Sequence, residues 1–211
     1  MKILGGDPNG KAAVIAKSLG LGCMICTSRP QHLASKRYLD FKFTAVDNGA
    51  FGCHKSGKPF NTELFLKNVD RVNKINLNPL FIVCPDIVAG GLKSLDFSMS
   101  WIDRIHYSKI ALVVQDGMTQ EDVSPIIKNF QYLFVGGSVS WKWRTAESWV
   151  RFAHDNSIPC HIGQAGQLWM LRAAKRFKAD SVDSTSWVVN KSWHIIREFQ
   201  KPQQMEFKLW D

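Results

Sequence analysis

Short apolar runs alternate with longer amphipathic stretches along the chain. The runs are rich in β-branched residues and end in Gly, Asp, Asn, Gln or Ser, which is typical of strands that stop at a turn. Between them, apolar residues recur at the spacing of one helix face. This pattern predicts strands at residues 2–6, 22–27, 43–46, 80–84, 110–115, 132–135, 159–163 and 181–183. It predicts helices at residues 11–19, 30–37, 62–73, 94–104, 145–155, 167–177 and 191–200, and one that begins at Thr119 with a near capping box to Asp122.

Eight strand–helix units in succession are the count of a single (β/α)₈ TIM barrel, an α/β fold. The 211 residues are at the small end for this fold, and an open doubly wound sheet with the same alternation is the alternative. No repeat, low-complexity tract or linker interrupts the chain. We therefore expect one domain over residues 1–211.

The chain is strongly basic, with a formal net charge of +9. This charge is compatible with a polyanionic partner such as DNA, because phosphate neutralisation by Lys and Arg dominates affinity for nucleic acids. Eight Trp and thirteen Phe add flat side chains that stack on unpaired bases or simply pack in the core. The longest apolar runs are too short to cross a bilayer, and residues 1–7 lack the apolar region of a signal peptide. We expect a cytoplasmic protein with no membrane partner.

The cysteines argue against a disulfide framework or a metal site. They are five in number and spread along the chain, namely Cys23, Cys26, Cys53, Cys84 and Cys160. Only Cys23 and Cys26 have CxxC spacing, and they lie in an apolar, strand-like run. We expect reduced, mostly buried thiols, with no metal and no cofactor.

Polar residues gather where the predicted strands end. In a TIM barrel these ends form the active site, so their clustering is the strongest bottom-up indication of function. The residues concerned are Asp47, Asp86, Gln115, Gly136, Gly137, His161 and Asp183. Structural interpretations remain open: Asp47-Asn48-Gly49 is a turn former, Asp86 is a candidate helix cap, and a lone His in a strand is often a core residue.

Aromatic and basic residues alternate after the sixth predicted strand. Trp141, Lys142, Trp143 and Arg144 combine groups that stack on bases with groups that bind phosphate. We interpret this segment as a DNA-gripping loop. The alternative is the start of a helix that packs its Trp side chains.

Five short segments, taken in order, resemble the tRNA-guanine transglycosylase superfamily, and more closely its small DNA-acting branch, the deazaguanine DNA transglycosylases. Residues 47–52 (Asp-Asn-Gly-Ala-Phe-Gly) resemble that superfamily's Asp-Ser-Gly-Gly-Phe-Gln segment, and residues 114–118 its Val-Gln-Gly-Gly-Met segment. Residues 180–183 (Asp-Ser-Val-Asp) resemble its Asp-x-Phe-Asp segment. Residues 85–86 and 135–137 resemble the site of its base-recognising Asp and its Val-Gly-Gly turn.

The resemblance implies roles for these residues. Asp183 corresponds to the nucleophile, Asp47 to the proton-transfer group, Phe51 to an aromatic that packs on the base, and Asp86 to the base-recognising acid. We expect Gln115, Gly136, Gly137 and His161 to complete the base-binding site. The partners implied are DNA with a flipped-out base and a free deazaguanine base.

Three departures from the tRNA enzymes favour DNA as the substrate. Their Cys/His zinc site has no counterpart, Gly52 replaces the Gln that closes the first motif, and the chain has no room for the insertions that grip tRNA. Two reactions on DNA share the cleavage of the N-glycosidic bond. In the first, a free base replaces the base that leaves. In the second, water replaces it, which is the reaction of a DNA glycosylase in repair or anti-phage defence. RNA base exchange and a non-catalytic nucleic-acid-binding barrel are the alternatives.

Overall fold

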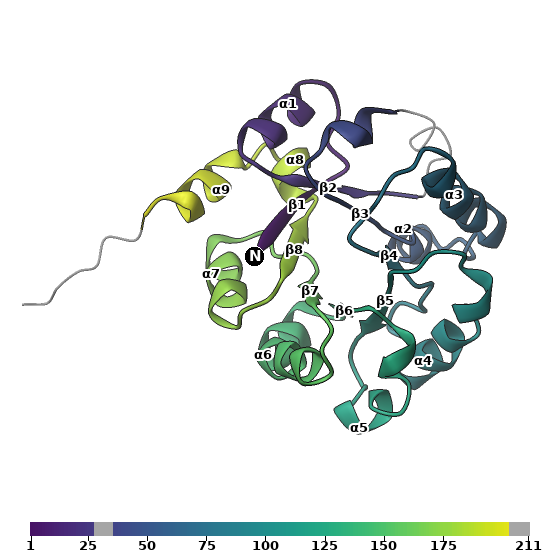
Figure 1. The fold of residues 1–211 in the computed structure, drawn as a ribbon. Helices are drawn as coiled ribbons and strands as arrows, with labels where there is room; N and C mark the ends of the chain where they lie inside the picture. The colour runs from purple at the N-terminus through teal and green to yellow at the C-terminus, as the bar shows by residue number, and fades with distance from the viewer. Residues whose placement is uncertain (28–35, 203–211) are drawn as a thin grey trace, which may run out of the picture.

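Eight parallel strands form a closed barrel in the computed structural model, which describes residues 1–27 and 36–202 (Figure 1). Each strand pairs with the next, and β1 pairs with β8 in the register Leu4 to Asp183. This last pairing closes the sheet, so the TIM-barrel prediction is confirmed and the open doubly wound sheet is excluded. The strands are β1 (Lys2–Gly6), β2 (Gly22–Ile25), β3 (Thr44–Val46), β4 (Ile82–Val83), β5 (Ile110–Val114), β6 (Tyr132–Val135), β7 (Cys160–Ile162) and β8 (Ser181–Ser184).

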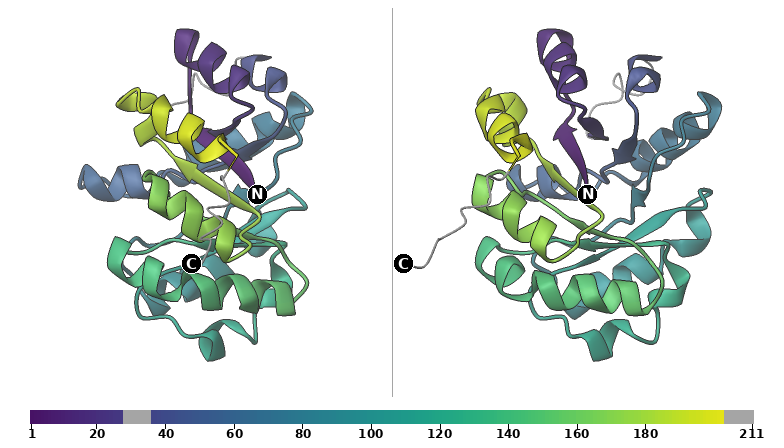
Figure 2. Two further views of the ribbon diagram at one scale, coloured as in Figure 1. Left: turned by 90° about the vertical axis from the view of Figure 1, so that its left-hand side faces the viewer. Right: turned by 60° about the vertical axis from the view of Figure 1, so that its left-hand side comes forward.

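The helices form a ring around the strands, which Figures 1 and 2 show from three directions. They are α1 (Gly10–Ser18), α2 (Ala50–Lys55), α3 (Thr62–Lys74), α4 (Leu92–Met99), α5 (Gln120–Val123), α6 (Val139–Asp155), α7 (Leu168–Arg176), α8 (Ser186–Val189) and α9 (Trp193–Gln200). Short 3₁₀ helices lie at Lys36–Asp40 (η2), Ile102–Arg104 (η3) and Ile127–Asn129 (η4). The capping box predicted for α5 is confirmed, with Thr119 and Asp122 bonded to each other's backbone amides.

Two apolar layers explain why the strands are apolar on both faces. One fills the barrel interior and consists of Leu4, Met24, Ala45, Phe81, Val83, Ala111, Val113 and Tyr132. The other lies between strands and helices and contains, for example, Ile25, Val46 and Trp149. Because side chains alternate along a strand, the positions that face inward can be followed from the core to the strand tips.

Most predicted elements are found within a few residues of their expected positions. The exceptions follow from local chemistry: α6 begins at Val139 because Ser138 caps it, and the helix expected at 94–104 ends at Met99 before a separate 3₁₀ turn. The six-residue helix α2 was not predicted. The helix predicted at 30–37 lies mostly outside the described residues.

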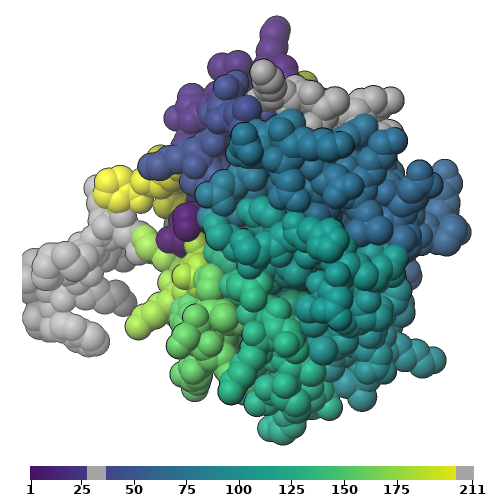
Figure 3. Space-filling model, turned by 45° about the vertical axis from the view of Figure 1, so that its right-hand side comes forward, coloured from purple at the N-terminus to yellow at the C-terminus, as the bar shows by residue number. Residues whose placement is uncertain are grey.

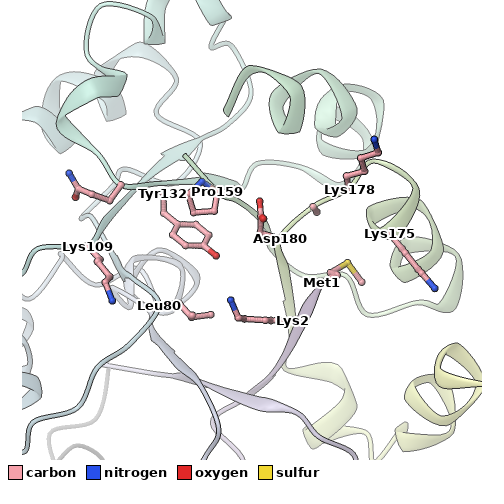
Figure 4. A pocket seen from close by; sticks show the side chains of 11 residues that line it. Met1, Lys2, Leu80, Lys109, Tyr132, Pro159, Lys175, Lys178 and Asp180 are labelled. Carbon is pink, nitrogen blue, oxygen red and sulfur yellow. The ribbon is translucent and has the colours of Figure 1, made fainter. Parts of the chain in front are cut away.

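The mouth at the amino ends of the strands, here called the lower mouth, holds an open cavity of about 850 Å³. Lys2, Tyr132 and Asp180 lie around it with Lys109 at its edge, as Figure 4 shows. In the space-filling view of Figure 3 the first residues of the chain, coloured dark purple, lie at the surface beside this region. The predicted catalytic residues lie at the opposite, upper mouth.

All five cysteines lie in the described part of the chain, and none forms a disulfide. Cys23, Cys84 and Cys160 are buried, and burial raises the pKa of each of these thiols. The expectation of mostly buried thiols is confirmed. Over residues 1–27 and 36–202, no helix is both long and apolar enough to span a membrane.

Candidate active site

Asp47 lies at the tip of β3, on the inner side of the barrel. Ala45 belongs to the interior layer, so Asp47, two residues further, faces the same axis. Its backbone N–H donates to the carbonyl of Ile25 at 2.8 Å, and the Thr27 hydroxyl donates to its carbonyl at 2.8 Å. The backbone N–H of Gly49 donates to Oδ2 at 3.3 Å. The backbone and one carboxylate oxygen are therefore both held in place.

Asn48 connects this loop to Asp86 on the neighbouring strand end. Its Nδ2 donates to the carbonyl of Cys84 at 2.7 Å and to Oδ1 of Asp86 at 2.8 Å. Its Oδ1 accepts from the backbone N–H of Ala50 at 2.8 Å, which is the local turn bond expected from the sequence. Asp86 does not cap α4, because that helix begins only after Gly91. Sequence reasoning missed the role of Asn48 as the link between the two acids.

Asp183 lies on β8 and is 8% exposed. Its Oδ1 accepts a hydrogen bond from Gln164 N–H at 3.2 Å and lies 3.0 Å from Nε2 of His161. The other ring nitrogen of His161 lies 2.9 Å from the Ser181 hydroxyl. His161 is fully buried and both of its nitrogens are paired, so the expectation that it contacts the base is wrong. It supports Asp183 from inside the barrel.

The three acids interact electrostatically across the upper mouth. Burial, together with the negative charges of Asp183 and Asp86, raises the pKa of Asp47 from 3.8 to about 7. Burial also raises the pKa of Asp86, although the bond from Asn48 opposes this effect. At neutral pH Asp47 therefore exchanges its proton readily, which is the property required of a general acid or base.

Lys142 belongs to the interior of the site. It is 1% exposed, and its Nζ donates to the carbonyl of Gly163 at 2.7 Å. Burial lowers its pKa to about 8, whereas the charges of Asp183 and Asp116 act in the opposite direction. The expectation that Lys142 contacts DNA is wrong, because a buried ammonium cannot reach a phosphate. Its charge instead compensates the acids of the site.

The segment around Lys142 is the start of α6, so the helix-start alternative is correct and the loop is not formed. Trp141 packs against Trp149 with ring centroids 6.3 Å apart, and Trp143 packs against Trp169 at 5.2 Å. Both Trp141 and Trp143 are half-buried against the outer core. Arg144 is exposed, and its Nε donates to the carbonyl of Ser140 at 3.2 Å. A DNA contact remains a prediction for Arg144.

Gln115 follows β5 on its inner side and is 2% exposed. Its Nε2 donates to the carbonyl of Ile87 at 2.9 Å, which fixes the amide beside the loop that carries Asp86. Gln115 and Asp86 are thus brought to neighbouring strand ends, as the sequence predicted. Their contact with a base remains a prediction.

Internal packing accounts for Gly136 and Gly137. A Cβ on Gly136 would lie 2.9 Å from the side chain of Val113, and Gly137 has a positive φ of 76° beside Asp116. Asp116 accepts two hydrogen bonds of 2.6 Å from the backbone N–H and hydroxyl of Ser138. The two glycines therefore let the chain turn into α6 under Asp116, and their approach to a base remains a prediction.

Phe51 lies on α2, directly after the Asp47 loop, and is 53% exposed. Between α2 and α3 a cavity of about 380 Å³ opens, lined by Asn48, Gly49 and Gly52 among others. This exposed aromatic side chain is available for stacking, and its contact with a base remains a prediction. Within the described ranges, no three His, Cys, Asp or Glu side chains are grouped so that they could hold a metal ion.

The sequence matches no model of a known protein family, and it has no match among the curated proteins.

Proposed function

We propose that the protein is an enzyme that cleaves the N-glycosidic bond of a nucleobase in DNA, with Asp183 as nucleophile and Asp47 as proton donor. The observation that carries this proposal is the convergence of Asp47, Asp86 and Asp183 at the upper mouth of the barrel, where the pKa of Asp47 is raised to about 7. A protonated acid beside a carboxylate is the pair that glycosidic cleavage requires. The choice of DNA rests on the sequence resemblance and on the basic charge.

In the first step a carboxylate oxygen of Asp183 attacks C1′ of the sugar. The C1′–N bond breaks, its electron pair goes to the base, and the proton of Asp47 neutralises the leaving nitrogen. The products are a covalent ester between Asp183 and the sugar, a free base and an ionised Asp47. The pair carries one negative charge throughout, on Asp183 before the step and on Asp47 after it, so the two carboxylates are never ionised together.

In the second step a nucleophile attacks C1′ and releases Asp183. If water attacks, Asp47 takes its proton and an abasic site remains, which is the reaction of a DNA glycosylase. If a free deazaguanine attacks, Asp47 takes the proton of its ring nitrogen and the base is exchanged. The same two residues serve both outcomes.

Substrate binding requires a flipped-out base, since the reacting atoms lie at the mouth of a closed barrel. Asp86 and Gln115 offer hydrogen bonds to the edge of that base, and Phe51 offers a stacking surface. Arg144 is exposed on α6, and we propose it as a phosphate contact.

The test uses oligonucleotides that contain unmodified or deazaguanine-type bases, incubated with the protein with and without the free base. Alkali-labile breaks without added base indicate hydrolysis, and incorporation of labelled free base indicates exchange. Asp183→Asn and Asp47→Asn should abolish either product, whereas Asp103→Asn, at an exposed position of η3, should have no effect. DNA binding without any product, unchanged in all three variants, would identify a non-catalytic binding barrel.

A further inference from the structure

A chain of polar side chains runs through the barrel interior, which is otherwise apolar. The Ser181 hydroxyl lies 2.9 Å from Nδ1 of His161, and Nε2 of His161 lies 3.0 Å from Oδ1 of Asp183. Ser181, His161 and Asp183 therefore form a continuous polar chain that ends at the candidate nucleophile.

Apolar packing isolates the imidazole of His161 in the middle of this chain. Its ring lies between Phe134, at a centroid distance of 4.6 Å, and Phe81, at 5.2 Å. The residue is fully buried. Its orientation is thus fixed by the two phenyl rings that pack against it and by Ser181 and Asp183 at its two nitrogens. A buried polar network of this kind is costly unless every member has a partner, and here each one does.

The proposed role of Asp183 sets the direction of the hydrogen bonds in this chain. A nucleophilic carboxylate can only accept, so Nε2 of His161 must carry a proton and donate it to Oδ1. In the tautomer with its single proton on Nε2, Nδ1 accepts and the Ser181 hydroxyl donates to it.

We propose that His161, oriented by Ser181, is a positioning residue that holds Oδ1 of Asp183 and leaves Oδ2 as the oxygen that attacks the sugar. Both hydrogen bonds that described residues make to this carboxylate, from His161 and from Gln164, end on Oδ1. An oxygen that accepts two donors is the weaker nucleophile, and fixing it also fixes the direction of the other oxygen. This assignment rests on the proposed function of Asp183.

Two amide substitutions separate positioning from packing. In His161→Gln the amide nitrogen occupies the place of Nε2 and can still donate to Asp183, whereas the shorter amide of His161→Asn reaches only the place of Nδ1 and Ser181. We expect His161→Asn to slow single-turnover cleavage by at least about 100-fold and His161→Gln by no more than about 10-fold. DNA affinity should change less than about twofold in both. Equal losses in the two variants, or a loss that appears in binding alone, would overturn the proposal.

A measurement on the unmodified protein keeps this test independent of turnover and of variant folding. Imidazole ¹⁵N shifts distinguish a protonated from an unprotonated ring nitrogen, and the His161 signals are identified by their loss in His161→Gln or, if that variant does not fold, by through-bond correlation. We expect a neutral ring protonated at Nε2. A ring protonated only at Nδ1 would refute the positioning role even if cleavage is observed. The expected ring without any cleavage of DNA would instead contradict the proposed function.

Discussion

Asp47→Asn should stabilise the folded protein at alkaline pH while it abolishes the proposed activity. Burial and the charges of Asp183 and Asp86 raise the pKa of Asp47 from 3.8 to about 7. Above pH 7 the folded state must therefore hold an unfavourable carboxylate, which the unfolded chain exposes to water. At about 1.4 kcal/mol per pKa unit, this rise corresponds to about 4 kcal/mol of unfolding free energy.

The sign of the pH dependence is fixed by linkage. Below pH 3.8 Asp47 is protonated in both states and has no effect on stability. Between 3.8 and about 7 the unfolded chain releases this proton and the folded protein keeps it, so the contribution of Asp47 to stability falls as pH rises. The Asn side chain does not ionise, and its Oδ1 can still accept the bond from Gly49. The advantage of Asp47→Asn should thus grow by about 1.4 kcal/mol per pH unit and level off near pH 8.

Urea unfolding of the parent and of Asp47→Asn at pH 5, 6, 7 and 8 measures this difference directly. Asp103→Asn is the matched control, because the same substitution at an exposed position should give a difference that does not change with pH. A constant difference between Asp47→Asn and the parent across this range would refute the electrostatic reasoning. In that case Asp47 would not be the group that transfers a proton near neutral pH.

Three further substitutions test other parts of the structure. Lys142→Met should slow single-turnover cleavage without changing the salt dependence of DNA binding, because the ammonium compensates the charge of Asp183 inside the barrel. A weaker dependence of DNA affinity on salt would instead indicate that Lys142 contacts a phosphate. Asp116→Ala should lower the unfolding free energy by about 1–2 kcal/mol in thermal or urea denaturation, because both bonds to Ser138 at the start of α6 are lost. Gly22→Ala should lower the unfolding free energy by about 1–3 kcal/mol in the same assay, because the added Cβ would clash with the ring and the backbone carbonyl of Phe43. An unchanged unfolding midpoint would contradict this packing.

The fold could be predicted because a (β/α)₈ barrel repeats one local pattern eight times. Errors of a few residues at single boundaries leave the count unchanged. The sequence could not distinguish a closed barrel from an open sheet, because the deciding contact joins β1 to β8, as in the register Leu4 to Asp183. That pairing depends on the tilt of all eight strands, which no local segment encodes.

The acids of the site were predictable from position alone. Asp47 and Asp86 follow apolar strands and Asp183 lies near the end of β8, and the carboxyl ends of parallel strands must meet at one mouth. Their supports were not predictable in the same way. The sequence predicts Asn48 as a turn residue, because sequence spacing suggests only its local hydrogen bond to Ala50. Its hydrogen bond to Asp86 joins residues 38 positions apart, which sequence spacing does not indicate. His161 looks like a ligand or a core residue until its partners on β8 are known.

Lys142 is the most instructive error, because the residues around it indicated a nucleic-acid contact. A basic residue between two Trp is typical of a DNA-binding loop. Here, however, Ser138 caps α6 and donates hydrogen bonds to Asp116, 22 residues away, so that α6 begins at Val139 and Lys142 lies buried on this helix. At that position its ammonium offsets the negative charge of Asp183, and a buried charge is tolerable only with such a partner. The site therefore combines a buried cation near Asp183 with a raised pKa at Asp47. In the proposed mechanism the cation lies near the nucleophile, and the raised pKa of Asp47 lets this second acid keep a proton near neutral pH.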